Sequence, residues 1–209
     1  MDNQQNETQN TWNKVAQVYA DKFLSLGIYT DSYERFFKGL ASDASVLDVG
    51  CGPGVIAYFL SKNYPKMTYQ GLDYAENMIE LAQKHFPQYE FLVKDARQLA
   101  EFPGEFNALC AGFCLPYLSI EEVPDFLKEC HYKLTEKGRF YLSFVPGEQN
   151  STREVTGSTG DSMTFSTFEK EWLIEELQLV GFKLLDECLI DFERPTGIEE
   201  HVVFILEKV

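Results

Sequence analysis

Three carboxylates and a run of glycines stand at regular places in the first half of the chain. Asp48 stands near the end of the short apolar run SVLDV, and the glycine-rich stretch GCGPG follows that run directly. Asp73 and Asp95 close the later runs MTYQGLD and YEFLVKD. A glycine-rich turn lets a ligand approach the backbone, and a carboxylate accepts hydrogen bonds from hydroxyl and amino groups. These residues predict a binding site for a ligand that carries such groups.

The position of Asp48 indicates which charge that ligand carries. Gly50 and Gly52 match the first two glycines of the dinucleotide fingerprint G-x-G-x-x-G, but Val55 takes the third place and the third glycine comes early, at Gly54. Asp48 would repel a pyrophosphate and attract an ammonium group. S-adenosylmethionine carries an ammonium, a sulfonium and a carboxylate but no phosphate, and it fits this pattern better than a dinucleotide.

Elements that could position these residues follow from the hydrophobic periodicity. Helical spacing covers residues 11–26 and 30–41, after which strand-like and helical runs alternate. Strands are predicted at residues 45–49, 67–73, 89–95, 106–113, 139–145, 182–193 and 199–209. Helices are predicted between them at residues 54–63, 75–86, 120–134 and 168–180.

This alternation predicts an α/β fold, a Rossmann-like doubly wound sheet that is mostly parallel, with helices on both faces. The last two strands are joined by a short connection, so the last strand is expected to be antiparallel. We expect a single domain over residues 1–209, with a disordered tail at 1–9, helices within 10–41 and the α/β core at 42–209. Ligands of such sheets bind at the carboxyl ends of the strands, where the three aspartates and Phe113 are expected.

Three stretches resemble the motifs of the class I S-adenosylmethionine-dependent methyltransferases, of the small-molecule, bacterial type. VLDVGCGPG resembles their first motif, GLDYAENMIELA their second and VKDARQL their third. The resemblance covers residues 10–209 in element order and is strongest over 45–118. It implies a methyltransferase that uses S-adenosylmethionine and releases S-adenosylhomocysteine.

The resemblance also implies which residues bind the cofactor. Asp48 would steer its amino group, Asp73 would hold the ribose, and Asp95 would read the adenine edge. Tyr19 lies on a helix that resembles the family's N-terminal lid. The implied cofactor-binding residues are Tyr19, Asp48, Gly50, Cys51, Gly52, Asp73, Tyr74, Met78, Asp95, Ala96 and Phe113.

No catalytic residue is identified. Many relatives carry a histidine pair after the fourth strand, where this sequence has Pro116 and Tyr117. A base could come from Tyr117, Glu148 or His201, and the lack of an obvious one favours an acceptor that needs little deprotonation. The acceptor pocket is expected between the N-terminal helices, the loop after the fourth strand and the polar, mobile loop 146–161, and to take a small, partly apolar molecule.

Composition limits the other classes of function. The net charge of −15 without a basic cluster argues against nucleic-acid binding. No run approaches the roughly 18 apolar residues of a membrane helix. The N-terminus lacks signal-peptide features, and the five cysteines form no C-x-x-C pair. We therefore expect a cytoplasmic protein with a small-molecule acceptor, no membrane partner and no metal site.

Two alternatives stay open. A non-catalytic module that only binds S-adenosylmethionine would show the same cofactor motifs. A nicotinamide-dependent oxidoreductase would use a similar sheet, although Asp48 and the displaced third glycine argue against it.

Overall fold

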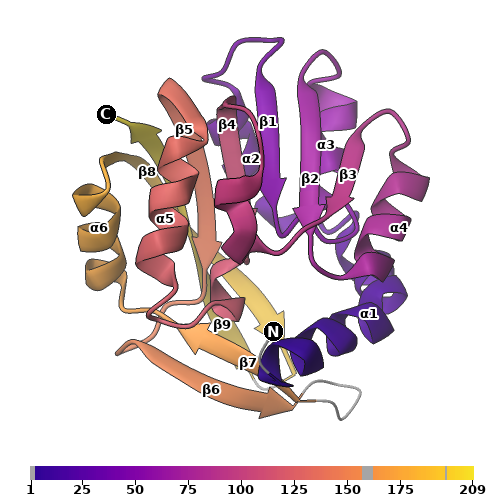
Figure 1. The fold of residues 1–209 in the computed structure, drawn as a ribbon, viewed down its shortest axis with the longest axis vertical. Helices are drawn as coiled ribbons and strands as arrows, with labels where there is room; N and C mark the ends of the chain where they lie inside the picture. Colours follow the sequence, from indigo (N-terminus) through magenta and orange to yellow (C-terminus); the bar gives the residue numbers. More distant parts are fainter. Residues whose placement is uncertain (1–2, 157–161, 196) are drawn as a thin grey trace.

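A seven-stranded sheet forms the centre of the molecule (Figure 1). The computed structural model describes residues 3–156, 162–195 and 197–209. The order of the strands across the sheet is β3-β2-β1-β4-β5-β9-β8. In chain order these strands are β1 (Ser45–Val49), β2 (Thr68–Asp73), β3 (Glu90–Val93), β4 (Phe106–Gly112), β5 (Leu134–Phe144), β8 (Phe182–Arg194) and β9 (Gly197–Lys208).

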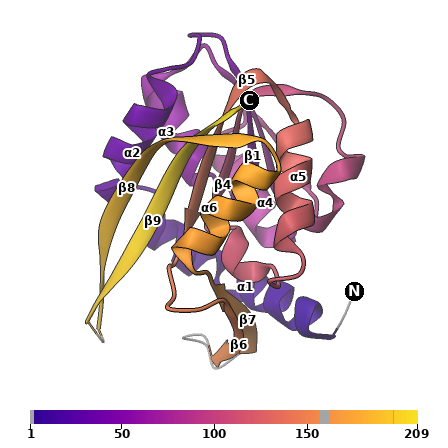
Figure 2. The ribbon, with the colours of Figure 1, turned by 90° about the vertical axis from the view of Figure 1, so that its left-hand side faces the viewer.

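Helices cover both faces of this sheet (Figures 1 and 2). The α-helices are α1 (Asn3–Phe23), α2 (Thr30–Phe37), α3 (Val55–Asn63), α4 (Glu76–His85), α5 (Val123–Tyr132) and α6 (Lys170–Leu179). Short 3-10 turns are η1 (Gly27–Tyr29), η2 (Ala96–Glu101) and η3 (Leu115–Tyr117). Among the described residues, no helix is long and apolar enough to cross a membrane.

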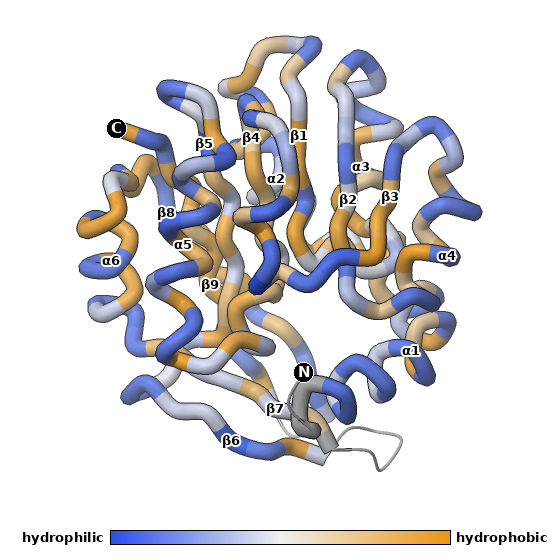
Figure 3. The backbone as a smooth tube through the Cα atoms, in the orientation of Figure 1, coloured by the Kyte–Doolittle hydropathy of each residue, from blue (hydrophilic) through white to orange (hydrophobic). Residues whose placement is uncertain are grey.

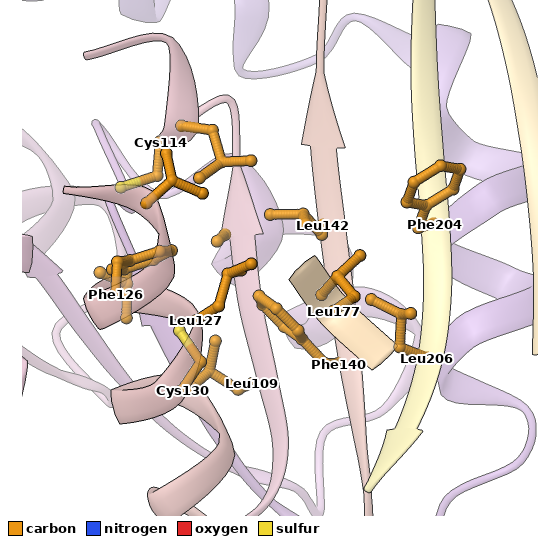
Figure 4. Close-up of a cluster of buried hydrophobic side chains, with 14 of the residues drawn as sticks. Leu109, Cys114, Phe126, Leu127, Cys130, Phe140, Leu142, Leu177, Phe204 and Leu206 are labelled. Carbon is orange, nitrogen blue, oxygen red and sulfur yellow. The ribbon is translucent and has the colours of Figure 1, made fainter. Parts of the chain in front are cut away.

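Two hydrophobic clusters hold these layers together, one on each face of the sheet. Leu109, Leu142 and Phe204 belong to the cluster under α5 and α6, which Figure 4 shows in part. Val46, Ala108 and Tyr141 belong to the cluster under α2, α3 and α4. Successive residues of a strand point to opposite faces, and residues of the central strands belong to both clusters, so these strands are apolar on both faces. Figure 3 shows the hydropathy along the chain.

The strand directions confirm the predicted fold class. Strands β1 to β5 are parallel to one another, whereas β9 pairs antiparallel with both β5 and β8. The last strand therefore lies inside the sheet, between β5 and the edge strand β8. Its antiparallel direction brings its first residues to the edge where β1 to β5 end: Val202 pairs with Phe144, the last residue of β5.

The expected disorder of residues 1–9 is wrong for the residues that are described, since α1 begins at Asn3. Polar composition alone suggested disorder, but contacts with the rest of the fold order this segment. The Gln9 side chain donates to the backbone oxygen of Tyr74, and Thr8 and Thr11 are buried. Asn13 forms two hydrogen bonds with Asn77 of α4.

The expected mobile loop 146–161 also contains regular structure. Strand β6 (Ser151–Thr156) pairs antiparallel with β7 (Ser162–Thr167) to form a second, two-stranded sheet. Residues 157–161 of the predicted loop lie outside the described residues. Figure 1 shows β6 and β7 on the same side of the molecule as α1, at the carboxyl ends of the parallel strands.

Candidate active site

The glycine turn after β1 presents bare backbone at the carboxyl edge of the sheet. The φ angles of Gly50 and Gly52 are 75° and 53°, in the region that favours glycine. A Cβ atom on Gly52 would lie 3.9 Å from the ring of Tyr19, so the turn faces α1 across a narrow space. The Gly52 N–H donates to Asp73 Oδ2 at 2.9 Å, which ties the turn to the end of β2.

Asp73 connects this turn with the start of α4. Its Oδ1 accepts a hydrogen bond from the Ala75 N–H at 2.9 Å, so each carboxylate oxygen has one backbone donor. Only 9% of the residue is exposed, and burial raises its pKa to about 6 although the backbone donors act to lower it. Each oxygen keeps a further lone pair that can accept a hydrogen bond from a ligand.

Asp48 lies beneath the same turn and is 1% exposed. Tyr69 donates to its Oδ2 at 2.6 Å, while Oδ1 has no hydrogen-bond partner among the described residues. Burial raises the pKa of Asp48 to about 7, against the lowering effect of the Tyr69 hydrogen bond, and Asp73 raises it further. A buried carboxylate oxygen without a partner is costly and marks a place where a donor can bind.

The raised pKa of Asp48 predicts a dependence of stability on pH. The folded protein holds this proton to about pH 7, whereas the unfolded chain releases it near the ordinary value of 3.8. The folded state binds more protons in this window, so the free energy of unfolding falls as pH rises, by about 1 kcal/mol per unit. Asp48→Asn can still accept the hydrogen bond from Tyr69, but its side chain does not titrate. We therefore expect the variant to lack this pH-dependent part of the free energy of unfolding.

Urea unfolding of wild type and Asp48→Asn between about pH 5 and pH 8 measures the effect. The stability of the wild type relative to the variant should fall as pH rises. Asp73 also titrates in this range in both proteins, and because it is coupled to Asp48 the difference includes that coupling. If the difference in unfolding free energy between wild type and variant stayed constant across this range, the raised pKa of Asp48 would be contradicted.

Helix α1 covers the glycine turn and the beginning of α4. Met78 is buried against Ala16 of α1, and Trp12 and Tyr19 pack on the same cluster. Burial raises the pKa of Tyr19 to about 12, and the nearby charge of Asp73 acts in the same direction. The hydroxyl of Tyr74 is buried beneath this cover and has no hydrogen-bond partner within the part of the chain that the structure describes.

Asp95 caps the turn that follows β3. Its Oδ1 accepts from the backbone N–H of Arg97 at 2.9 Å, and the Arg97 guanidinium also reaches this carboxylate. Arg97 pairs with Glu122 at 2.6 Å as well, and Ala96 packs on the main hydrophobic cluster. The structure therefore shows a capping role for Asp95 and places its carboxylate, 9% exposed, at the same edge as Asp48 and Asp73.

Phe113, just after β4, has a φ of 56°, which a bulky residue adopts only under constraint. Its N–H donates to Ser143 Oγ on β5 at 2.9 Å. Its ring lies edge-on to His201 at 4.6 Å between centroids and to Tyr29 at 5.6 Å. This backbone turn aims the ring of Phe113 at the start of β9.

A hydrogen-bonded chain runs through His201, which is 4% exposed. Tyr29 Oη lies 2.7 Å from His201 Nδ1, and His201 Nε2 lies 2.9 Å from Glu199 Oε1. Arg194 binds the same oxygen of Glu199 through Nε at 2.8 Å and Nη2 at 2.5 Å. Phe192 stacks on His201 with 4.9 Å between ring centroids.

Aromatic rings continue from this chain to the cover formed by α1. Phe192 contacts Phe23, which stacks on Tyr19 at 4.3 Å. Trp12 contacts Tyr19 and Tyr117, each at 5.3 Å between ring centroids. Aromatic rings therefore connect α1, which covers the glycine turn, with His201 on β9.

Comparison with known proteins bears on the family. A family model described as a methyltransferase domain matches residues 46–138, a range that includes the three motifs. The demethylmenaquinone methyltransferase of Thermotoga maritima is 28% identical over 199 residues, covering 90% of this chain and 82% of the relative. The trans-aconitate 2-methyltransferase of Delftia acidovorans is 35% identical over 172 residues, covering 81% of this chain and 63% of the relative.

The family model, the relatives and the solved structures support a class I S-adenosylmethionine-dependent methyltransferase. The fold agrees with a solved structure, the 1,6-didemethyltoxoflavin-N1-methyltransferase of Burkholderia thailandensis with bound S-adenosylhomocysteine. Its TM-score to this methyltransferase is 0.74 at 20% identity, over 98% of this chain and 88% of that one.

Sequence reasoning missed two polar residues of this methyltransferase's carboxyl edge, Tyr29 and Glu199. Glu199 and His201 are two residues apart on one strand, so they share a face, and this spacing was a usable signal. Nothing local in the sequence marks Tyr29, which meets His201 only through the tertiary fold. Glu148, an expected candidate base, is exposed.

Proposed function

We propose that this methyltransferase transfers a methyl group from S-adenosylmethionine to a small-molecule acceptor by in-line displacement. The observation that carries the proposal is that two buried polar atoms, Asp48 Oδ1 and Tyr74 Oη, have no hydrogen-bond partner among the described residues. Asp48 lies just before the glycine turn, and Tyr74 directly follows Asp73, which binds Gly52 of that turn. Polar atoms buried at a cost next to a cradle without side chains fit a polar nucleoside ligand.

In this proposal the cofactor-binding residues are those expected from the sequence. Asp48 faces the amino group, the turn from Gly50 to Gly52 lines the methionine part, and Asp73 accepts from the ribose hydroxyls. Asp95 and Ala96 border the adenine, with Met78 and Tyr74 on its other sides, while Tyr19 and Phe113 close the site. The lone pairs that remain on Asp73 support the ribose role, because both oxygens are already oriented by backbone donors.

In this proposal the protein accelerates the reaction mainly by positioning the acceptor and the cofactor, because the cofactor already carries a reactive methyl group. The cofactor supplies a methyl group on a positively charged sulfur, which a nucleophile can displace. Holding a nucleophile in line with that methyl group accounts for roughly 7 to 11 kcal/mol of the barrier in well-oriented systems. The aromatic rings of Tyr19, Phe23 and Phe192 offer an apolar surface for a small acceptor and exclude water from it.

A small-molecule acceptor is supported by the charge of the protein and by the names of its relatives. A net charge of −15 disfavours a polyanionic substrate. The relatives described above are named for demethylmenaquinone, trans-aconitate and 1,6-didemethyltoxoflavin.

Two measurements test the proposal. Calorimetry should show binding of S-adenosylhomocysteine and no comparable binding of NAD. Incubation with S-adenosylmethionine and a panel of phenols, carboxylates, amines, thiols and N–H heterocycles should then yield S-adenosylhomocysteine and a methylated product by mass spectrometry. Binding of S-adenosylhomocysteine without turnover of any acceptor would favour a non-catalytic module, and the absence of binding would overturn the proposal.

A further inference from the structure

The polarity of the chain from Tyr29 to Glu199 follows from its chemistry. An ionised carboxylate only accepts hydrogen bonds, so His201 must carry its proton on Nε2, facing Glu199. Nδ1 of the neutral ring is then an acceptor, and the hydroxyl of Tyr29 must donate to it. Tyr29 Oη has used its one proton and offers only lone pairs to any third group.

The groups around His201 favour this neutral state. Burial lowers the pKa of His201, and the positive charge of Arg194 acts in the same direction, although Glu199 acts to raise it. Burial opposes ionisation of Glu199, but hydrogen bonds from His201 and Arg194 lower its pKa overall. Lys22 on α1 lies 5.5 Å from the Phe192 ring that stacks on His201 and is a further positive charge on this side.

Tyr29 also lies close to the cofactor-binding side of the edge. Phe192, which stacks on His201, contacts Phe23, and Phe23 stacks on Tyr19. Tyr19 in turn faces Gly52, and burial and then the charge of Asp73 raise the pKa of its hydroxyl group. Phe113, which follows β4 at the same edge, packs on both Tyr29 and His201.

We infer that Tyr29, His201 and Glu199 form a proton-accepting relay for the methyl acceptor, with Tyr29 Oη as the atom that meets it. This inference rests on the proposed function and specifies its substrate class. The acceptor carries a weakly acidic hydroxyl or ring N–H, whose proton must leave as the new bond to carbon forms. An acceptor without such a proton, such as a thioether or a tertiary amine, has no use for the relay.

The proton balance is simple. The acceptor X–H bond breaks and its proton moves to Tyr29 Oη, while the original Tyr29 proton moves to His201 Nδ1. The electron pair left on X forms the bond to the methyl carbon, and the carbon–sulfur pair leaves with the thioether. The resulting imidazolium of His201 is stabilised by Glu199, the role that a carboxylate plays behind a histidine base. The imidazolium of His201 then releases its extra proton to solvent.

The resting arrangement can be tested without cofactor or acceptor. Nitrogen-15 NMR of the three histidines, with His201 assigned by its loss in His201→Gln, should show a neutral ring protonated on Nε2 near pH 7. Glu199→Gln should lower the His201 pKa further, because it removes the charge that stabilises the imidazolium. A neutral ring protonated on Nδ1 could not take a proton from Tyr29 and would overturn the inference.

Turnover provides the second test, with the acceptor that gives the most product in the panel. Tyr29→Phe and His201→Gln should lower kcat by about 10² to 10⁴-fold, the usual contribution of a general base. Calorimetric binding of S-adenosylhomocysteine should change less than about threefold, since neither residue is assigned to the cofactor. In wild type, kcat should fall as pH drops through the pKa of His201, and this acid limb should be absent from His201→Gln.

Tyr33→Phe is the matched control. It removes a phenolic hydroxyl from the same buried aromatic cluster, where Tyr33 packs 6.3 Å from Tyr29 between ring centroids. We expect it to keep kcat and its pH profile. Undiminished turnover by Tyr29→Phe, or an equal loss in Tyr33→Phe, would overturn the relay while leaving the proposed function intact. If the wild-type protein bound no S-adenosylhomocysteine, that result would instead count against the proposed function. The NMR measurement would still decide which nitrogen of His201 carries the proton.

Discussion

Replacing Asp73 with alanine should weaken binding of S-adenosylhomocysteine by at least about 100-fold, the equivalent of losing two hydrogen bonds to a charged group. The carboxylate is buried, and both of its oxygens are oriented by backbone donors from Gly52 and Ala75. Isothermal calorimetry on the variant and wild type measures the change.

Two further variants separate cofactor binding from folding. Asp73→Asn keeps the size of the side chain but turns one acceptor into a donor, so it should also bind poorly. Asp31→Ala removes an exposed carboxylate from the first turn of α2, away from the proposed site, and should bind as wild type does. If Asp73→Ala bound S-adenosylhomocysteine within threefold of wild type, Asp73 would be a cap of α4 and nothing more.

Replacing Gly52 with valine should abolish detectable binding of S-adenosylhomocysteine. The φ of 53° strains any branched residue by about 1 to 2 kcal/mol. More importantly, the added atoms would fill the narrow space between the glycine turn and the ring of Tyr19. The effect on binding should exceed the effect on stability, because one end of the cradle is blocked while the core beneath it is unchanged.

Gly104→Val is the control for this strain. Gly104 also has a positive φ, 97°, but it precedes β4 and therefore lies at the opposite edge of the sheet. Thermal unfolding should show a loss of stability in both variants, whereas calorimetry should show a loss of binding in Gly52→Val alone. Equal loss of binding in the two variants would mean that strain, and not steric exclusion, caused the effect.

Local patterns were sufficient for the parallel half of the sheet. SVLDV, TYQGLD and YEFLVKD are runs with an aspartate at or next to their end, and the structure has β1, β2 and β3 there. Asp48 and Asp73 lie just inside a strand end, and Asp95 lies just beyond one. The helix-period runs between them became α3 and α4. These elements are predictable because burial on both faces of a parallel sheet requires continuous apolar runs.

Local patterns failed where distant residues decide the structure. Residues 3–9 are polar, yet they continue α1, where Gln9 and Thr8 find partners in the turn before α4 and on β7. Residues 151–156 are polar too, yet they pair with β7 along the full length of β6. Composition reports how much apolar area a segment can bury by itself and not which hydrogen-bond partners the rest of the fold offers.

The sequence by itself determined the proposed cofactor side of the edge, because the residues involved follow consecutive strands that all end at one edge. Only the tertiary structure decided the side that we propose for the acceptor. Tyr29 and His201 are 172 residues apart and meet because β9 runs antiparallel beside β5, which returns its first residues to the edge where the parallel strands finish. A contact of that kind depends on strand order and direction, and no short stretch of sequence carries that information.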